Sequence, residues 1–253
     1  MTNTQPASPT MESPVLVRLA ALALAFSGLS FLLYPVVRPW HDESTYIGAV
    51  TSMSSDAWVA AHLFAIFALI LMPLGLLGLC RLVVRSRGFG LTVAATVIIW
   101  FGAGLSLPYY GAEDFALHAL ARQAGFGSPL DLLSLVKAIR FGAAAATTFA
   151  AGLVLLGVGG VLIAISIWRT AILPRLSGMP LAIALALLIP QFYLPAWARI
   201  AHGMQVALAL ILLAALLWTA TRVTAAGLAT VSSTTTLTSV ESPSMTISVQ
   251  EAQ

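Results

Sequence analysis

The sequence predicts an all-α integral membrane protein, a bundle of six transmembrane helices with amphipathic helices in a long outer loop. The 253 residues are 59% hydrophobic and 8% charged, whereas a soluble domain is about 45–50% apolar and roughly 25% charged. So few charges could not cover a water-exposed surface, which excludes a soluble enzyme. The apolar runs are continuous instead of alternating at every second residue, and this excludes transmembrane strands.

Six segments are long enough to cross a bilayer, which takes about 20 mainly apolar residues in a helix. They cover residues 15–37, 58–84, 90–110, 141–168, 176–197 and 201–220. The first segment is expected to be an uncleaved helix instead of a signal peptide. It follows fourteen residues without a basic side chain, and its apolar stretch exceeds the usual 7–15 residues.

The distribution of basic residues predicts the orientation, because cytoplasmic loops carry the excess of Lys and Arg. Two loops hold arginines without an acidic residue, namely those with Arg81, Arg85, Arg87 and with Arg169, Arg175. We therefore expect a multi-pass plasma-membrane protein with both termini in the cytoplasm. Residues 14–222 should form the bundle, and residues 1–13 and 223–253 are expected to be disordered cytoplasmic tails, the second rich in Ser and Thr.

The long outer loop, residues 112–140, contains signals for amphipathic helices. Ser128, Pro129 and Asp131 resemble a helix start, with a capping serine, a first-position proline and a carboxylate in the first turn. Apolar residues then recur at helical spacing, and a shorter helix is expected over 113–123. Such helices could be packing lids for the bundle or could have a lipid-sensing or gating role.

The fourth span is rich in small residues, which let helix backbones approach closely in a membrane. They are Gly142, Ala143 to Ala146, Gly152, Gly157, Gly159 and Gly160. This face predicts a central position and offers a surface for a homo-oligomer or a partner membrane subunit. The lipid bilayer is the other expected partner, and the scattered charges do not suggest nucleic acid.

Polar side chains from four helices reach a similar depth near the outer face: His62, Glu113, Gln191, His202 and Gln205. A polar group inside the apolar zone must form a hydrogen bond, bind a ligand or line water. These five are therefore the candidate ligand-binding residues. Among them, His62 and His202 could bind a divalent metal or a haem between two helices. The structural alternative is that imidazole at headgroup level only anchors helices.

Two functions remain open on the sequence alone. One is a non-enzymatic structural, accessory or small-ligand-binding membrane protein with a polar pocket near its outer face. The other is a redox or metal-dependent membrane enzyme that uses a histidine-bound haem or metal. The sequence has no nucleotide-binding loop, no lysine within a span and no acidic residue near the centre of one. The absence of catalytic motifs favours the first function.

Overall fold

The computed structural model describes residues 14–238 and is helical, with no strand in that range. The helices are α1 (Pro14–Val37), α2 (Tyr46–Met53), α3 (Asp56–Leu82), α4 (Phe89–Gly111), π-helix η1 (Ala112–Leu117), α5 (His118–Gly125), α6 (Leu132–Phe141), α7 (Ala143–Thr170), α8 (Met179–Ala186), 3₁₀-helix η2 (Pro190–Tyr193) and α9 (Ala196–Thr238). The all-α fold class predicted from the sequence is therefore confirmed for the described residues.

Five helical stretches are long and apolar enough to cross a membrane, and they make the chain a multi-pass membrane protein. They are Pro14–Val37, Asp56–Leu82, Phe89–Gly125, Ala143–Thr170 and Ala196–Arg222. Large apolar side chains stay exposed along them, including Phe26, Trp100 and Leu208. Such side chains are suited to contact with lipid.

Five of the six expected spans are present as long helices, whereas residues 176–197 do not form one long helix. The structure has the eight-residue α8 there, followed by a turn and then η2. Eight residues of α-helix extend only about 12 Å, far less than the ~30 Å core of a bilayer. Pro190 and Pro195 explain the interruption, since proline lacks a backbone donor and restricts the residue before it.

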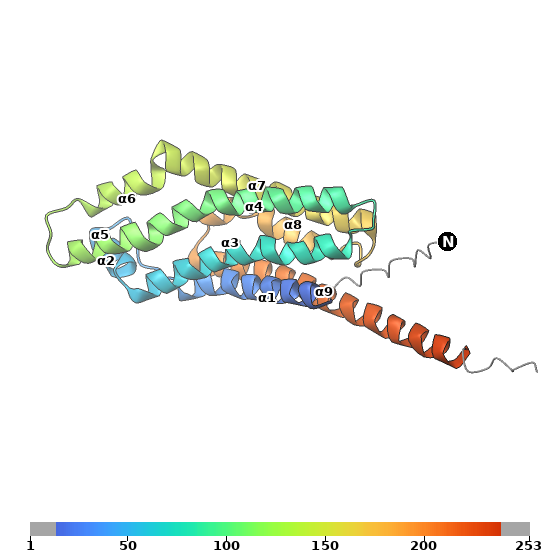
Figure 1. Cartoon of the computed structure of the whole chain (residues 1–253). Coiled ribbons are helices and arrows are strands. Elements are labelled where there is room, and N and C mark those ends of the chain that lie inside the picture. Colours follow the sequence, from blue (N-terminus) through green and yellow to red (C-terminus); the bar gives the residue numbers. More distant parts are fainter. Residues whose placement is uncertain (1–13, 239–253) are drawn as a thin grey trace, which may run out of the picture.

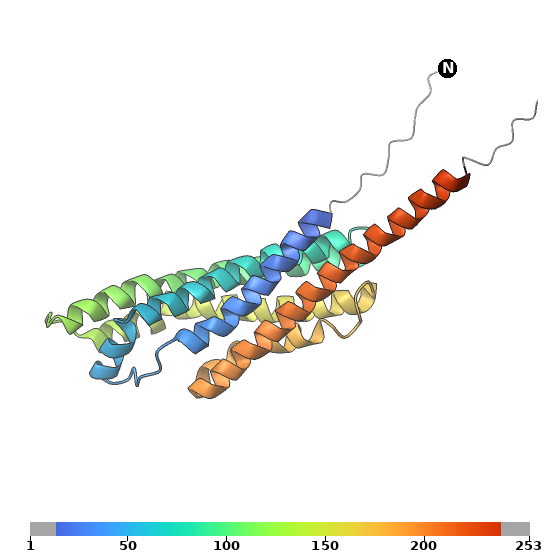
Figure 2. The ribbon, with the colours of Figure 1, turned by 90° about the horizontal axis from the view of Figure 1, so that it is seen from below.

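The five long helices and α8 pack side by side in a closed ring. α1 contacts α3 and α9, α4 contacts α3 and α7, and α8 contacts α7 and α9. As Figures 1 and 2 show, the start of α1 and the far part of α9 lie at one end of the bundle. The opposite end carries α2, α5 and α6 (Figure 1) and is called the capped end below.

The capped end has a small apolar core of its own. Trp58 and Leu117 are fully buried there against residues of the cap, which are Ala49, Met53, Ala121, Ala124, Leu132 and Val136. Helix α6 lies where the longer amphipathic helix was expected, whereas α5 continues α4 and η1 in one helical stretch, Phe89–Gly125, and is not a separate helix of a loop. α6 begins at Leu132 instead of Ser128, because the carboxylate of Asp131 accepts the hydrogen bond from Ser134 N that caps the helix.

The small residues of α7 pack within the chain. Gly152 and Gly159 lie against α4, and Gly160 lies against α8. A Cβ at Gly152 would come within 2.8 Å of the carbonyl oxygen of Gly102 on α4. These contacts to α4 and α8 make α7 one member of the closed ring of helices, not the central helix that its small residues predicted. A homo-oligomer or a partner subunit on this face stays a prediction.

α9 continues as a helix to Thr238 and so passes the boundary at residue 222 that the sequence suggested. Residues 1–13 and 239–253 lie outside the described residues, and the tails expected there stay predictions. The cytoplasmic orientation of both termini also stays a prediction.

Candidate functional site

Glu113 is placed by a change in helix type. α4 continues without a break into the π-helix η1, and the wider turn places Glu113 and Asp114 in the interior of the capped end, where both are buried. Single π-turns within α-helices are frequent at functional sites. Neither carboxylate oxygen of Asp114 has a hydrogen-bond partner in the described part of the chain. The carboxylate of Glu113, in contrast, is fully engaged.

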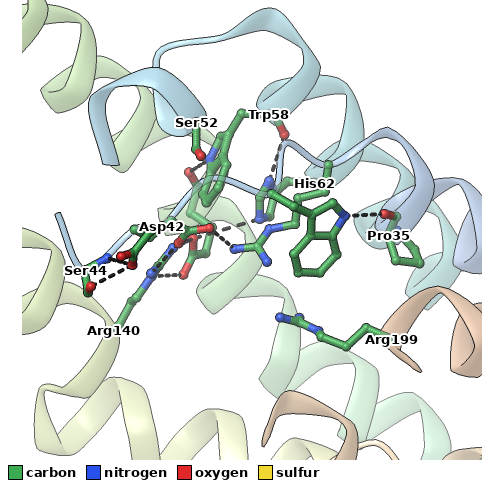
Figure 3. A network of polar contacts seen from close by, with 12 residues as sticks. Pro35, Asp42, Ser44, Ser52, Trp58, His62, Arg140 and Arg199 are labelled. Atoms are coloured by element: carbon green, nitrogen blue, oxygen red, sulfur yellow. Dashed lines mark hydrogen bonds and ion pairs between the residues drawn. The ribbon is translucent and has the colours of Figure 1, made fainter. Parts of the chain in front are cut away.

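Two arginines and two glutamates form a linked ion-pair network across the capped end (Figure 3). Arg140 on α6 binds Glu113 through two N–H donors, with Nε to Oε1 at 2.6 Å and NH2 to Oε2 at 2.8 Å. Its remaining terminal nitrogen, NH1, donates to Glu43 Oε2 at 2.8 Å, and Arg38 donates to the other oxygen of Glu43 at 2.7 Å. The network thus joins the end of α1, the following loop, η1 and α6, and its four charges balance.

The loop that carries Glu43 is held in place by its own hydrogen bonds. Thr45 caps α2 by accepting from Gly48 N, and a Cβ at Gly48 would collide with the carbonyl oxygen of Asp42. Hydrogen bonds from the hydroxyl and the backbone N–H of Ser44 lower the pKa of the exposed Asp42 carboxyl. Glycine at position 48 therefore allows the loop to fold closely over α2.

The charge state of Arg140 follows from its surroundings. Burial acts to lower the pKa of its guanidinium, but the carboxylates of Glu113 and Glu43 outweigh burial and hold that pKa above its ordinary value. Arg140 is consequently a fixed cation within the network.

Trp58 and His62 on α3 contact the residues of the ion-pair network. The indole of the fully buried Trp58 donates to the carbonyl oxygen of Glu113 at 2.7 Å, and the guanidinium of Arg38 lies 4.9 Å from its ring centre. His62 Nδ1 bonds to the carbonyl oxygen of Trp58 at 2.8 Å, so Nδ1 must carry the hydrogen. The other ring nitrogen, Nε2, faces Glu113 Oε2 at 3.9 Å.

Arg199 on α9 stands apart from this network in Figure 3. Its Nε donates to Gln191 Oε1 at 3.1 Å, and its guanidinium lies 4.8 Å from the ring centre of Trp40 and 5.0 Å from that of Phe192. Trp40 is itself fixed by a 2.9 Å hydrogen bond from its indole to Pro35 O. Arg199 therefore has an amide and two aromatic rings as neighbours, and no carboxylate within ion-pair distance in the described chain.

These groups surround a cavity of about 610 Å³ at the capped end, which we call the polar cavity. Its charged and polar lining includes Arg38, His41, Asp42, Glu43, His62, Glu113, Arg140 and Arg199. Its remaining wall is mainly aromatic and aliphatic, with Tyr34, Tyr110, Phe149, Leu153, Ile189 and Phe192. The cavity thus combines a band of fixed charges with an apolar wall contributed by α7 and by the segment between α8 and α9.

A second cavity of about 250 Å³ lies between α4–η1 and α6–α7. Tyr109, Glu113 and Arg140 line this smaller cavity and the polar cavity as well. The ring of Tyr109 is stacked on Phe149 at 4.0 Å between centres. One tyrosine and one ion pair therefore form a shared wall between the two spaces.

The structure brings together some of the site residues suggested by the sequence. His62 and Glu113 line the polar cavity and face each other. The buried Gln191 does not line it, but it accepts a hydrogen bond from Arg199, which does. His202 and Gln205 do not line it. Instead, His202 Nε2 lies 2.8 Å from the carbonyl oxygen of Ala184 on α8.

The suggested metal or haem pair of His62 and His202 is consequently not assembled around a common cavity. Residues 14–238 also hold no cluster of three or more His, Cys, Asp or Glu side chains that could bind a metal. Neither observation supports ligation by these two histidines.

Sequence reasoning missed the arginines and tryptophans of the site. The candidate residues suggested by the sequence do not include Arg38, Arg140 and Arg199, nor Trp40 and Trp58. A usable signal was present, since the loops expected on the outer side balance basic against acidic residues, whereas the other loops hold unopposed arginines. Mixed charges at one end of an apolar bundle indicate ion pairs within the protein.

Comparisons of this chain with protein-family models, with curated proteins and with solved structures find no match. The geometry of the capped end is therefore the basis on which a function can be argued.

Proposed function

We propose that this multi-pass membrane protein binds a small ligand in the polar cavity and does not itself catalyse a reaction. The observation that supports this proposal is the size and lining of the polar cavity. Its volume of about 610 Å³ lies within the range of about 300–1,000 Å³ that small-molecule sites occupy. Like such sites, it has a largely apolar wall and a few convergent polar groups.

The state of the polar groups supports binding over catalysis. Arg38, Glu43, Glu113 and Arg140 are engaged with one another, and His62 and Trp58 are fixed by hydrogen bonds to backbone carbonyls. Groups that satisfy each other in this way maintain the shape of a site. No observation in the structure favours the alternative of a histidine-bound haem or metal.

Filling the cavity tests this proposal. Ala150 on α7 lines the polar cavity and is exposed, so its replacement by Trp should occupy the space without disturbing the core. Ala151 is the next residue, is also exposed and lines no cavity described above, so Ala151→Trp is a matched control.

Native mass spectrometry of the protein, purified in mild detergent, would record small molecules that remain bound. The wild type and Ala151→Trp should carry the same discrete adduct, and Ala150→Trp should lose it while keeping its helical circular dichroism. An adduct pattern common to all three proteins, or a wild type without adduct, would contradict the proposal.

A further inference from the structure

We propose that the ligand is an amphipathic anion, with a carboxylate or phosphate group bound by Arg199 and an apolar body against the α7 wall. This inference rests on the proposed function, because it assigns the chemistry of the ligand in the same cavity. Three arginines and three carboxylates line the cavity, and the pairing among them leaves Arg199 without a carboxylate partner.

Two of these arginines are already neutralised. Arg38 is paired with Glu43, and Arg140 is paired with Glu43 and Glu113. Among residues 14–238, Arg199 has no carboxylate within 4 Å, and its hydrogen bond to Gln191 uses Nε alone. The carboxylate of Asp42 also lines the cavity, but it accepts from Ser44 and forms no ion pair with Arg199. Arg199 is half-buried, and taking a cation partly out of water costs free energy unless an opposite charge or strong hydrogen bonds compensate it. An anionic ligand group would supply both.

The surroundings hold the guanidinium in one orientation. The Gln191 amide oxygen accepts from Nε, and Gln191 is itself 7% exposed. The rings of Trp40 and Phe192 lie within 5.0 Å of the guanidinium carbon. Because Nε is occupied, the two terminal nitrogens are left to donate, and such a planar pair of donors matches the two oxygens of a carboxylate or phosphate.

The rest of the lining describes the other part of the ligand. Phe149, Leu153, Ile189 and Phe192 form an apolar wall within the same cavity. Phe149 and Phe192 contact each other edge to face at 5.7 Å, which continues the wall from α7 to the Arg199 side. A ligand that carries an apolar body next to its anionic group would cover this wall, whereas a small hydrated anion would leave it in contact with water.

Probes with one tail and different head groups test the assignment. The protein in dodecyl maltoside would be titrated with dodecyl phosphate, with dodecyltrimethylammonium and with inorganic phosphate, and bound probe would be counted by native mass spectrometry. Dodecyl phosphate should bind one to one and better than the other two. Equal binding of dodecyltrimethylammonium would overturn the anionic assignment, and equal binding of inorganic phosphate would overturn the amphipathic one.

Variants of Arg199 locate the anion. Arg199→Gln should weaken dodecyl phosphate binding by about tenfold to a hundredfold, because hydrogen bonds to a charged group are lost. Arg199→Lys should fall in between, since it keeps the charge and the fold but not the paired donors. Arg222→Gln removes an exposed arginine at the other end of the spanning stretch Ala196–Arg222 and should bind like the wild type.

The two proposals can fail separately. Unchanged binding in Arg199→Gln, together with loss of binding in Ala150→Trp, would overturn the role of Arg199 and leave the cavity as a binding site. Unchanged binding in Ala150→Trp would overturn both. Because the comparison of the three probes uses the wild type, the assignment of the head group stays testable even if Arg199→Gln does not fold.

Discussion

Arg140 and Glu113 form a two-point ion pair that fastens the cap to the bundle. The two residues are 27 positions apart, on α6 and in η1, and their side chains are 14% and 7% exposed. The same guanidinium reaches Glu43, which is 97 positions away in the chain. A single side chain thus holds three segments around the polar cavity.

Replacing Arg140 by Gln is expected to destabilise the protein by about 3 kcal/mol. The substitution leaves the buried carboxylate of Glu113 without its ion-pair partner, while Glu43 keeps Arg38. An uncompensated buried charge typically costs 3–5 kcal/mol. The free energy of unfolding, measured by titration of the micelle-bound protein with denaturing detergent, would show this loss.

Arg122→Gln is the matched control, because Arg122 on α5 is exposed in the same cap. Its effect should stay within about 0.5 kcal/mol. The double variant Glu113→Gln with Arg140→Gln should recover part of the lost stability, since the unpaired charge of Glu113 is then removed. Equal stability of Arg140→Gln and Arg122→Gln would show that the network does not hold the cap.

The long spans were predictable from the sequence because the bilayer imposes a minimum apolar length on each helix. The expected segments 58–84 and 141–168 lie within two residues of α3 and α7 at each end. The segment 176–197 failed for a physical reason. A hydropathy average counts apolar side chains and does not register that Pro190 and Pro195 interrupt the helical hydrogen bonds.

The sequence indicated how far along the helices the histidines lie, but not which way their side chains point. His62 and His202 were correctly placed on long helices, yet which way each ring points depends on how α3 and α9 pack. That packing turns His62 toward Glu113 and His202 toward the backbone of α8. The Arg140–Glu43 pair was out of reach as well, because nothing local in either sequence segment indicates a partner 97 residues away.

The two histidines should therefore respond differently to substitution. His62→Ala should reduce the occupancy of the polar cavity, since His62 lines it, and His202→Ala should leave occupancy unchanged. Each variant loses one hydrogen bond to a carbonyl oxygen, worth on the order of 1 kcal/mol. The native mass spectrum of each variant is the measurement. An equal loss of bound ligand in both would restore the common histidine site suggested by the sequence.

The packing of α4 against α7 should depend on Gly152 and not on Gly157. A Cβ at Gly152 would lie 2.8 Å from Gly102 O, whereas a Cβ at Gly157 would meet its nearest atom at 3.5 Å, an ordinary contact. Gly152→Ala should therefore cost about 1–3 kcal/mol of unfolding free energy, as overpacking does. Gly157→Ala on the same helix should be neutral or slightly stabilising, because Ala favours helix. If the two variants unfold alike, close approach of the two backbones is not what holds α4 to α7.

The interrupted segment α8–η2 should carry the chain back across the membrane. α7 ends at Thr170, near the end of the bundle where α1 starts, and α9 begins at Ala196 toward the capped end (Figure 2). The residues between them must connect the two ends, so Arg175 and Tyr193 should lie on opposite sides. Both are exposed, and each can be replaced by Cys in a background with Cys80→Ser.

Labelling with a membrane-impermeant thiol reagent in intact cells tests this expectation. Tyr193→Cys should react together with Ser54→Cys, which is at the capped end after α2, and Arg175→Cys should behave like Ser86→Cys between α3 and α4. If the orientation expected from the unopposed arginines is right, the first pair reacts from outside and the second only after lysis. Reaction of the second pair alone would reverse the orientation. Identical reactivity of Arg175→Cys and Tyr193→Cys would instead show that α8 and η2 enter and leave the membrane on one side.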